Sequence, residues 1–153
     1  MNTDKVEILL VEDNVMDIEL TLHALRKENV SHCIHVVRDG EEALDFLFCR
    51  GEYRERSLDR PPKLVVLDLK VPKIDGLEVL RIIKGDARTR AIPVAILTSS
   101  KEERDLVEGY NLGANSYIRK PVDFDEFREI VKQLGLYWMI VNQPPPARAF
   151  SQP

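Results

Sequence analysis

The sequence predicts an α/β protein whose parallel sheet has five strands and carries helices on both faces. Short apolar runs alternate five times with segments of helical periodicity along the 153 residues. The runs are almost continuously apolar, which is typical of strands buried on both sides. Strands that alternate with helices form parallel sheets through right-handed crossovers. The carboxyl ends of all five strands should therefore lie along one edge of the sheet.

The first part of the chain supplies three strands and two helices. The run from Val6 to Val11 predicts a buried strand. Asn14 is a favourable N-cap for the next helix, whose apolar face would carry Val15, Ile18, Leu22 and Leu25. A second strand is expected at 34–37, and the helix after it is marked by Ala43, Leu44, Leu47 and Phe48. The polar segment 50–63 predicts a loop before a third strand at 64–68.

The second part supplies two more strands and three helices. The third helix is marked by Leu77, Leu80 and Ile83. A strand is expected at 94–98, followed by a helix over about 102–113 that ends at a glycine. A short strand at 116–119 precedes a fifth helix, which Asp123 would cap. The apolar positions of that helix are Phe124, Phe127, Ile130, Val131 and Leu134.

Composition narrows the possible partners. Apolar residues make up 44% and charged residues 31%, and the net charge is -4, so neither disorder nor a general attraction to nucleic acid or anionic membrane is expected. No apolar stretch approaches the roughly 20 residues of a membrane span. The amino terminus lacks the features of a signal peptide. Cys33 and Cys49 have no CxxC spacing, which favours reduced, half-buried thiols in a cytoplasmic protein.

Side chains suited to phosphoryl chemistry follow four of the predicted strands. Glu12 and Asp13 follow the first, Asp68 ends the third, Thr98 ends the fourth and Lys120 follows the fifth. A single acid at a strand end is more often a turn or cap residue than a catalyst. Four strand ends with matching chemistry are more informative, because doubly wound sheets bind ligands beyond the carboxyl ends of their strands.

The chemistry of this set indicates a magnesium-dependent phosphoacceptor. Three converging carboxylates repel one another, and Mg²⁺ or Mn²⁺ would relieve that repulsion. Asp68 stands alone at its strand end and is the favoured nucleophile, since aspartate can form an aspartyl phosphate. Asp13 is the favoured metal ligand, with Glu12 beside it. Lys120 would hold one phosphoryl oxygen, and the Thr98 hydroxyl would donate a hydrogen bond to another.

From about Val6 to Leu134 the chain resembles response-regulator receiver domains, through the motifs LLVEDN, VVLDLKVPKIDG, VAILTSS and YIRKPVDFDEF. The resemblance implies a flavodoxin-like strand order 2-1-3-4-5 and a receiver domain over residues 1–142. It implies Asp68 as the phosphoacceptor and Glu12 and Asp13 as an acidic metal pair. The backbone carbonyl of Lys70 would be a further metal ligand.

The same resemblance implies a conformational switch and a partner. Thr98 and Tyr117 occupy the switch positions, and the bond between Lys120 and Pro121 would be cis. The charged insertion before LVVLDL and the ending GLYWMIVNQPP are similar to small receivers that serve cyanobacterial phytochrome histidine kinases. The chain is then expected to be a stand-alone response regulator, phosphorylated by such a kinase, rather than a turnover enzyme.

The segment after the fifth helix bears on output. It is too short for a DNA-binding domain, so signalling through protein contacts is expected. The run from Leu136 to Val141 either extends the helix and packs on the core or forms an interface. A homodimer is expected, through the face of the fourth helix, fifth strand and fifth helix or through the C-terminal segment. Its interface residues would be Tyr117, Phe127, Leu136, Tyr137 and Trp138. Residues 143–153 are expected to be flexible or extended.

Two other functions are compatible with a strand-end aspartate. Phosphohydrolases of the haloacid dehalogenase type place a second acid two residues after the nucleophile, whereas this chain has Lys70 there. A receiver-like interaction module that is never phosphorylated would have no use for the complete set of pocket residues. A nucleotide-binding fold is a weaker alternative, because no strand is followed by GxGxxG or GxxxxGK.

Overall fold

The computed structural model describes residues 3–27 and 33–150 and contains the predicted sheet. Its strands are β1 (Ile8–Val11), β2 (Ile34–Val37), β3 (Leu64–Leu67), β4 (Val94–Thr98) and β5 (Ser116–Arg119). The sheet order is β2-β1-β3-β4-β5, and each neighbouring pair is parallel. The expected doubly wound, flavodoxin-like order is therefore confirmed.

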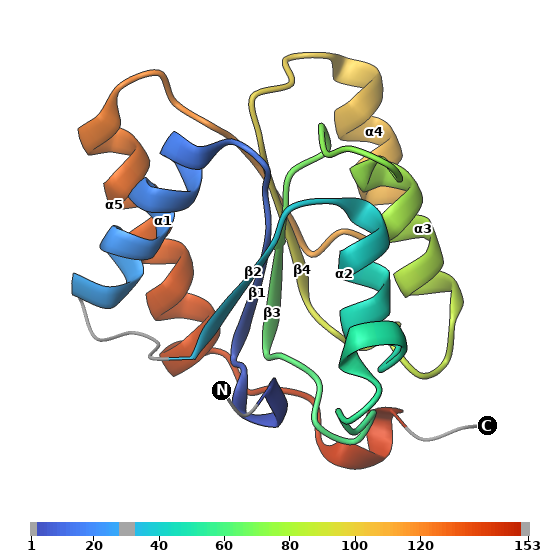
Figure 1. The fold of residues 1–153 in the computed structure, drawn as a ribbon. Coiled ribbons are helices and arrows are strands. Elements are labelled where there is room, and N and C mark those ends of the chain that lie inside the picture. The colour runs from blue at the N-terminus through green and yellow to red at the C-terminus, as the bar shows by residue number, and fades with distance from the viewer. Residues whose placement is uncertain (1–2, 28–32, 151–153) are drawn as a thin grey trace.

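Helices cover both faces of this sheet. They are α1 (Val15–Lys27), α2 (Gly40–Leu47), α3 (Gly76–Gly85), α4 (Glu103–Asn111) and α5 (Phe124–Leu136). Figure 1 shows α1 and α5 on one face and α2, α3 and α4 on the other. Shorter elements are η1 (Thr3–Lys5), η2 (Gly51–Tyr53), a π-helical turn η3 (Tyr137–Val141) and η4 (Ala147–Phe150). Of the helices described, none is long and apolar enough to cross a membrane.

The core is divided by the sheet into two layers. Alternate strand residues such as Leu9, Val65 and Ile96 pack with α2 and α3. The residues between them, including Leu10 and Val66, pack with α1 and α5. Both sets are almost fully buried, which explains why the strands are apolar at consecutive positions rather than at every second one.

Side-chain caps begin four of the helices. Asn14 Oδ1 accepts a hydrogen bond from the Asp17 amide (3.0 Å), and Asp123 Oδ1 accepts one from the Glu126 amide (2.9 Å), as predicted. Asp39 and Asp75 cap α2 and α3 in the same way. The predicted apolar face of α1 is wrong at its first position, since Val15 is 56% exposed. Leu25 is buried as predicted, together with Thr21 and Ala24, and Ile18 and Leu22 are partly buried against the core.

The run after α5 continues the helix as η3, as the first of the two alternatives predicts. Trp138 and Met139 pack partly against the core, whereas Tyr137, Ile140 and Val141 are exposed, so the interface alternative stays a prediction.

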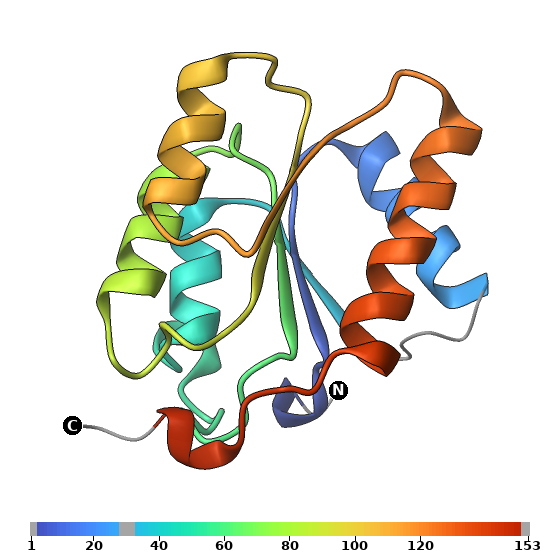
Figure 2. The same ribbon diagram turned by 180° about the vertical axis from the view of Figure 1, so that it is seen from behind.

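The described part of the C-terminal tail, residues 143–150, contacts the domain, and residues 151–153 of the tail predicted to be flexible or extended lie outside the described residues. Figure 2 shows the chain then crossing beneath the amino-terminal ends of the strands. The described part of the tail ends in η4, whose Phe150 is 6% exposed and belongs to the same core cluster as Val6 and Tyr53. An aromatic anchor at the end of a proline-rich segment therefore attaches the tail to the domain.

Replacing Phe150 by alanine should lower the free energy of unfolding by about 1.5–3 kcal/mol, the typical contribution of one buried aromatic side chain. The loss is limited because the tail can detach without unfolding the sheet. Urea denaturation measures it. Arg148→Ala is the matched control, since Arg148 is exposed on the same short helix and should change stability by less than about 0.5 kcal/mol. Equal stability of the two variants would contradict the anchoring of the tail.

Candidate functional site

The carboxyl ends of β1, β3 and β5 meet around one lysine. Lys120 Nζ lies 2.5 Å from Glu12 Oε1, 2.8 Å from Asp17 Oδ2 and 3.0 Å from Asp68 Oδ2. The side chains of Lys120, Glu12 and Asp68 are only 7%, 4% and 7% exposed. Residues 108 positions apart in the sequence thus form one buried ionic cluster.

The sheet itself fixes the backbone of these residues. The amide of Glu12 donates to the carbonyl of Val37 (3.0 Å), and the amide of Asp68 donates to the carbonyl of Val11 (3.0 Å). The amide of Lys120 donates to the carbonyl of Thr98 (2.7 Å). Each of these bonds extends a parallel ladder by one residue beyond the strand. The functional side chains therefore leave the sheet from fixed positions.

Burial and the shared lysine set the charges in the cluster. Burial raises the pKa of Glu12 to about 7, against the opposing effect of Lys120 and with the charge of Asp68 adding to the rise. Burial would also raise the pKa of Asp68, but hydrogen bonds from Glu12 and Lys120 hold it below its ordinary value. Ion pairs with Asp17 and Glu12 outweigh burial and raise the pKa of Lys120. Near neutral pH, Asp68 is consequently ionised and Glu12 holds a proton for part of the time.

Thr98 and Tyr117 lie on neighbouring strands. Thr98 is fully buried, and its Oγ1 accepts a hydrogen bond from the Ser100 amide (3.3 Å). Tyr117 stands beside Ile96 in the β4–β5 register. Its hydroxyl oxygen is buried and has no hydrogen-bond partner within the described part of the chain. The two predicted switch residues are therefore two residues apart in the β4–β5 register, and the tyrosine hydroxyl points inward.

Asp13 and Lys70 lie at a hollow of about 490 Å³ beside the cluster. The other lining residues are Leu69, Val71, Pro72, Asp75, Leu77 and Asp105. The carbonyl of Asp13 is held by Arg38 Nη2 at 2.9 Å, and the Lys70 amide donates to Asp68 Oδ1 at 3.2 Å. Asp13 and Lys70 therefore line the same hollow, and the Lys70 amide connects it to Asp68. Their roles as metal ligands stay predictions.

The donor set fits a hard divalent cation. Four carboxylates lie at one end of the sheet, those of Glu12, Asp13, Asp17 and Asp68. Among the residues that the structure describes, the only positive charge within the cluster is the ammonium group of Lys120. In the described ranges, no group of three or more His, Cys, Asp or Glu side chains is placed so that it could hold a metal ion by itself. Mg²⁺ typically uses only one or two carboxylates and keeps several waters, so a site for it does not need three such side chains.

Two of the sequence-based expectations are wrong. The Lys120–Pro121 bond is trans, as no cis peptide bond occurs in the described residues. Trans is the lower-energy isomer before proline by about 0.5–1 kcal/mol, and Lys120 reaches all three carboxylates with it. Phe127 is 3% exposed and packs in the core between α5 and the sheet. It therefore cannot belong to an interface surface.

Asp17 is the site residue that the sequence reasoning missed. It lies in the first turn of α1 and contacts Lys120 at 2.8 Å. The available signal was its place three residues after the Asn14 cap, at the same end of the sheet as Glu12. That position also suits an ordinary acid at a helix amino terminus, so the sequence alone does not single it out.

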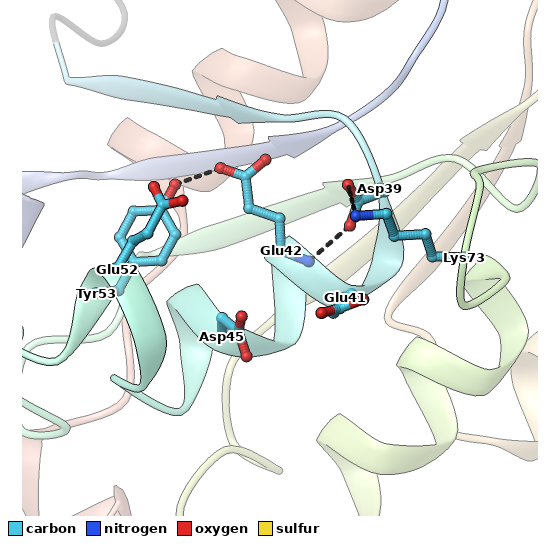
Figure 3. Close-up of a pocket in the computed structure, with 7 residues that line it drawn as sticks. All are labelled: Asp39, Glu41, Glu42, Asp45, Glu52, Tyr53 and Lys73. Carbon is cyan, nitrogen blue, oxygen red and sulfur yellow. Dashed lines mark hydrogen bonds and ion pairs between the residues drawn. The ribbon is translucent and has the colours of Figure 1, made fainter.

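A second group of acids lines a depression beside α2. Figure 3 shows its seven residues, Asp39, Glu41, Glu42, Asp45, Glu52, Tyr53 and Lys73. Tyr53 Oη donates to Glu42 Oε2 (2.5 Å), and Lys73 Nζ lies 3.6 Å from Asp39 Oδ2. These contacts connect α2 to the segments around it. Since Glu41 and Glu52 are exposed to solvent, we place the functional site at the buried strand-end cluster instead.

Comparison with known proteins agrees with this placement. The family model described as "Response regulator receiver domain" matches residues 8–132. The probable methanogenesis regulatory protein FilR2 of Methanothrix harundinacea is 42% identical over 142 residues, which cover 93% of this chain and 89% of that protein. Response regulator Rcp1 of Synechocystis is 37% identical over 138 residues, covering 90% and 91%.

Solved structures give the same result. The phosphorylated cyanobacterial phytochrome response regulator RcpA superposes with a TM-score of 0.85 at 41% identity, over 90% of this chain and 96% of that one. The Mn²⁺-bound form of Rcp1 superposes with a TM-score of 0.84 at 36% identity, over 90% and 97%. Similarity of fold and sequence therefore extends over nearly the whole of each protein.

Proposed function

This chain belongs to the response-regulator receiver family, and on that basis we propose that it accepts a phosphoryl group on Asp68 from a sensor histidine kinase. The observation that carries the proposal is the buried contact between Asp68 and Lys120 at 3.0 Å. Lys120 and Glu12 keep the pKa of the Asp68 carboxyl low despite its burial, so the carboxylate is ionised and able to act as a nucleophile.

Transfer then follows from the positions of the side chains. The kinase presents a phosphohistidine, and an Asp68 oxygen attacks its phosphorus in line. The phosphorus–nitrogen bond breaks as the oxygen–phosphorus bond forms, and its electron pair stays on the ring nitrogen. An aspartyl phosphate results, and the histidine leaves as a neutral imidazole because its other ring nitrogen carries a proton in the phosphohistidine. Lys120 stays beside the acceptor and offsets the charge of the phosphoryl oxygens. We assign the protein as a phosphoacceptor that assists its own phosphorylation and dephosphorylation, rather than as a turnover enzyme.

Glu12, Asp13 and Asp68 would hold Mg²⁺ or Mn²⁺, with the Lys70 carbonyl as a further ligand. The cation would supply positive charge to the phosphoryl oxygens during transfer. Support comes from the oxygen-rich donor set and from the relative Rcp1, whose structure is described as Mn²⁺-bound. Burial is the main cause of the raised pKa of Glu12, and the neighbouring charge of Asp68 adds to it.

The response to phosphorylation would involve Thr98 and Tyr117. Thr98 would turn its hydroxyl toward the new phosphoryl group, and Tyr117 would move into the space this opens. The inward ring of Tyr117 and its unpartnered hydroxyl are consistent with a resting conformation that has an alternative. Phosphorylation would thus bias a two-state element formed by α4, β5 and α5.

A phytochrome-type kinase is the proposed donor, because the structural relative RcpA is described as a phytochrome response regulator. Apolar side chains at the same end of the sheet as Asp68 are available for kinase docking, namely Val15, Met16, Val122 and Phe124. Output would pass through a homodimer of stand-alone cytoplasmic receivers, with no nucleic acid or membrane as partner. Tyr117, Leu136, Tyr137 and Trp138 remain candidates for its interface, and Ile140 and Val141 are exposed beside them.

Asp68→Asn should abolish the hydroxylamine-sensitive label that the wild type acquires from a phosphorylated histidine kinase. Asparagine keeps the size of the side chain but cannot form an acyl phosphate. The measurement is transfer of radioactive phosphate in the presence of Mg²⁺. Asp59→Asn is the control, because Asp59 is exposed in the segment before β3 and should leave labelling unchanged. Full labelling of Asp68→Asn would show that the acceptor is another residue.

The same assay separates the alternatives. A receiver takes up no more than one phosphoryl group per chain before the label decays, whereas a phosphohydrolase releases phosphate over many turnovers. An interaction module that is never phosphorylated would remain unlabelled in the wild type.

A further inference from the structure

Helix α4 carries a buried acid that no base neutralises. Asp105 is 8% exposed although the helix is otherwise polar and mostly solvent-facing. In the described ranges no lysine, arginine or histidine nitrogen forms an ion pair with it. A buried carboxylate costs stability unless it is hydrogen-bonded. The hydrogen-bond partners of Asp105 therefore indicate which part of the protein this carboxylate stabilises.

Its partner is a serine in the loop that leaves the phosphoacceptor site. Ser100 Oγ donates to Asp105 Oδ2 at 2.6 Å, and both residues are 8% exposed. The Ser100 amide donates to Thr98 Oγ1 at 3.3 Å. A continuous chain of hydrogen bonds thus connects the hydroxyl of Thr98, through Ser100, to the first turn of α4. Asp105 also lines the hollow that contains Asp13 and Lys70.

The next turn of α4 faces Tyr117. Gly109 follows Asp105 by four residues and lies on the same face of the helix. A Cβ added at Gly109 would lie 3.0 Å from Ile96 Cδ1 and 3.2 Å from Tyr117 Cδ2. The absence of a side chain at this position lets the inward ring pack against the helix. One face of α4 therefore contacts Tyr117 directly and reaches Thr98 indirectly, through Ser100.

We propose that Asp105 is a positioning residue that holds the β4–α4 loop in the resting state through its hydrogen bond to Ser100. The inference rests on the proposed phosphoacceptor function and names a residue that would control its conformational switch. Turning Thr98 toward a phosphoryl group requires its hydroxyl to leave the Ser100 amide, which moves the loop. The bond to Asp105 opposes that movement. Its strength sets how strongly the resting conformation is favoured.

The same contact also closes the amino end of α4, because Ser100 Oγ accepts the Glu102 amide at 3.3 Å. The contact could act only as a helix cap, or it could also restrain the resting state. These two roles predict different changes in affinity for a phosphoryl analogue when the contact is removed. Loss of a helix cap lowers stability and does not improve ligand binding. Loss of a restraint on the resting state increases the population that binds the analogue, so the apparent affinity rises.

The experiment measures the apparent Kd of beryllofluoride with Mg²⁺, by two-dimensional NMR titration of the full chain. Asp105→Ala is expected to bind on the order of two- to tenfold more tightly than the wild type, the range given by one hydrogen bond. Glu108→Ala removes an equal charge from an exposed position of the same helix and should bind as the wild type does. Unchanged or weaker binding by Asp105→Ala overturns the proposal.

Two further variants separate the hydrogen bond from charge. Ser100→Ala keeps the carboxylate but removes the donor, and it should reproduce the gain of Asp105→Ala. Asp105→Asn removes the charge but keeps an acceptor, and it should gain less. Equal gains for the Asn and Ala variants, with none for Ser100→Ala, would show that the carboxylate only repels the anion. These variants also carry the test if Asp105→Ala does not fold.

The double variant tests whether the two residues act together. Ser100→Ala should add nothing in the Asp105→Ala background, because the bond is already lost. If the gains in affinity of the two single variants added up in the double variant, the two residues would not act through one shared hydrogen bond. Wild-type protein that binds no beryllofluoride overturns the proposed phosphoacceptor function and this inference with it. If the wild type binds beryllofluoride and the variants bind it with the same affinity, only the role of Asp105 is overturned.

Discussion

Replacing Lys120 by methionine is expected to lower the free energy of unfolding by about 3–5 kcal/mol at pH 8 and to abolish phosphotransfer. Removing one partner of a buried ion pair leaves an uncompensated charge, and this range is typical of the penalty. Here the ammonium group of Lys120 forms ion pairs with three carboxylates. Two of them, those of Glu12 and Asp68, are only 4% and 7% exposed. Methionine retains much of the stem of the lysine, so packing contributes little to the difference.

The loss in free energy of unfolding caused by Lys120→Met should be smaller at pH 6 than at pH 8. The pKa of Glu12 is about 7 in the folded protein and 4.5 in an unfolded chain. Without the lysine it rises further. Between the unfolded and folded values the folded protein holds a proton that the unfolded chain has lost. Stability then falls as the pH rises through this window. At lower pH the variant can neutralise Glu12 with a proton in place of the ammonium.

Urea denaturation at the two pH values measures both effects. Lys101→Met is the control, because Lys101 is exposed in the β4–α4 loop and should alter stability by less than about 0.5 kcal/mol. Added Mg²⁺ should restore part of the stability of Lys120→Met, since a ligand that binds only the folded state stabilises it. A deficit below about 1 kcal/mol that is the same at both pH values would mean that the acids do not depend on this lysine.

The sequence predicted the sheet well because burial on both faces leaves a direct pattern. The runs of β2 and β5 were assigned with the bounds that the structure has. The first strand was predicted to begin at Val6, whereas β1 begins at Ile8. Val6 is 3% exposed and belongs to the core, but among the described residues its amide donates to the carbonyl of Thr3 (3.4 Å) rather than to a neighbouring strand. Apolar character reports burial, and burial extends beyond hydrogen-bonded pairing.

Strand-end residues were predictable for a related reason. Parallel topology brings every carboxyl end to the same edge, so knowing the strands was enough to bring Glu12, Asp68 and Lys120 together. Contacts that do not follow from topology were not predictable. Arg56 is 6% exposed, with its guanidinium 3.8 Å from the ring centre of Phe46, although the segment around it is polar. Burial of Phe150 likewise depends on where a proline-rich segment happens to cross.

Gly76→Ala is expected to destabilise the fold by about 1–3 kcal/mol, the usual range for forcing a methyl group into a packed core. A Cβ at Gly76 would lie 2.5 Å from the carbonyl oxygen of Asp68 and 2.6 Å from Leu69 Cα. Both are backbone atoms at the end of β3, so neither can rotate away. The amide of Gly76 also donates to the carbonyl of Leu69 at 3.0 Å. Relief of the clash must therefore separate α3 from the strand that carries the phosphoacceptor.

That displacement should also reduce the rate of phosphotransfer by on the order of a hundredfold, because in-line attack is lost when the nucleophile shifts by about 1 Å. Gly85→Ala is a matched control at the other end of α3. Nothing lies within 4 Å of a Cβ there, and alanine is a better helix former by about 0.5–1 kcal/mol. It should be neutral or slightly stabilising, with normal labelling. If Gly76→Ala were as stable and active as Gly85→Ala, the close approach of α3 to Asp68 would have no part in holding the site.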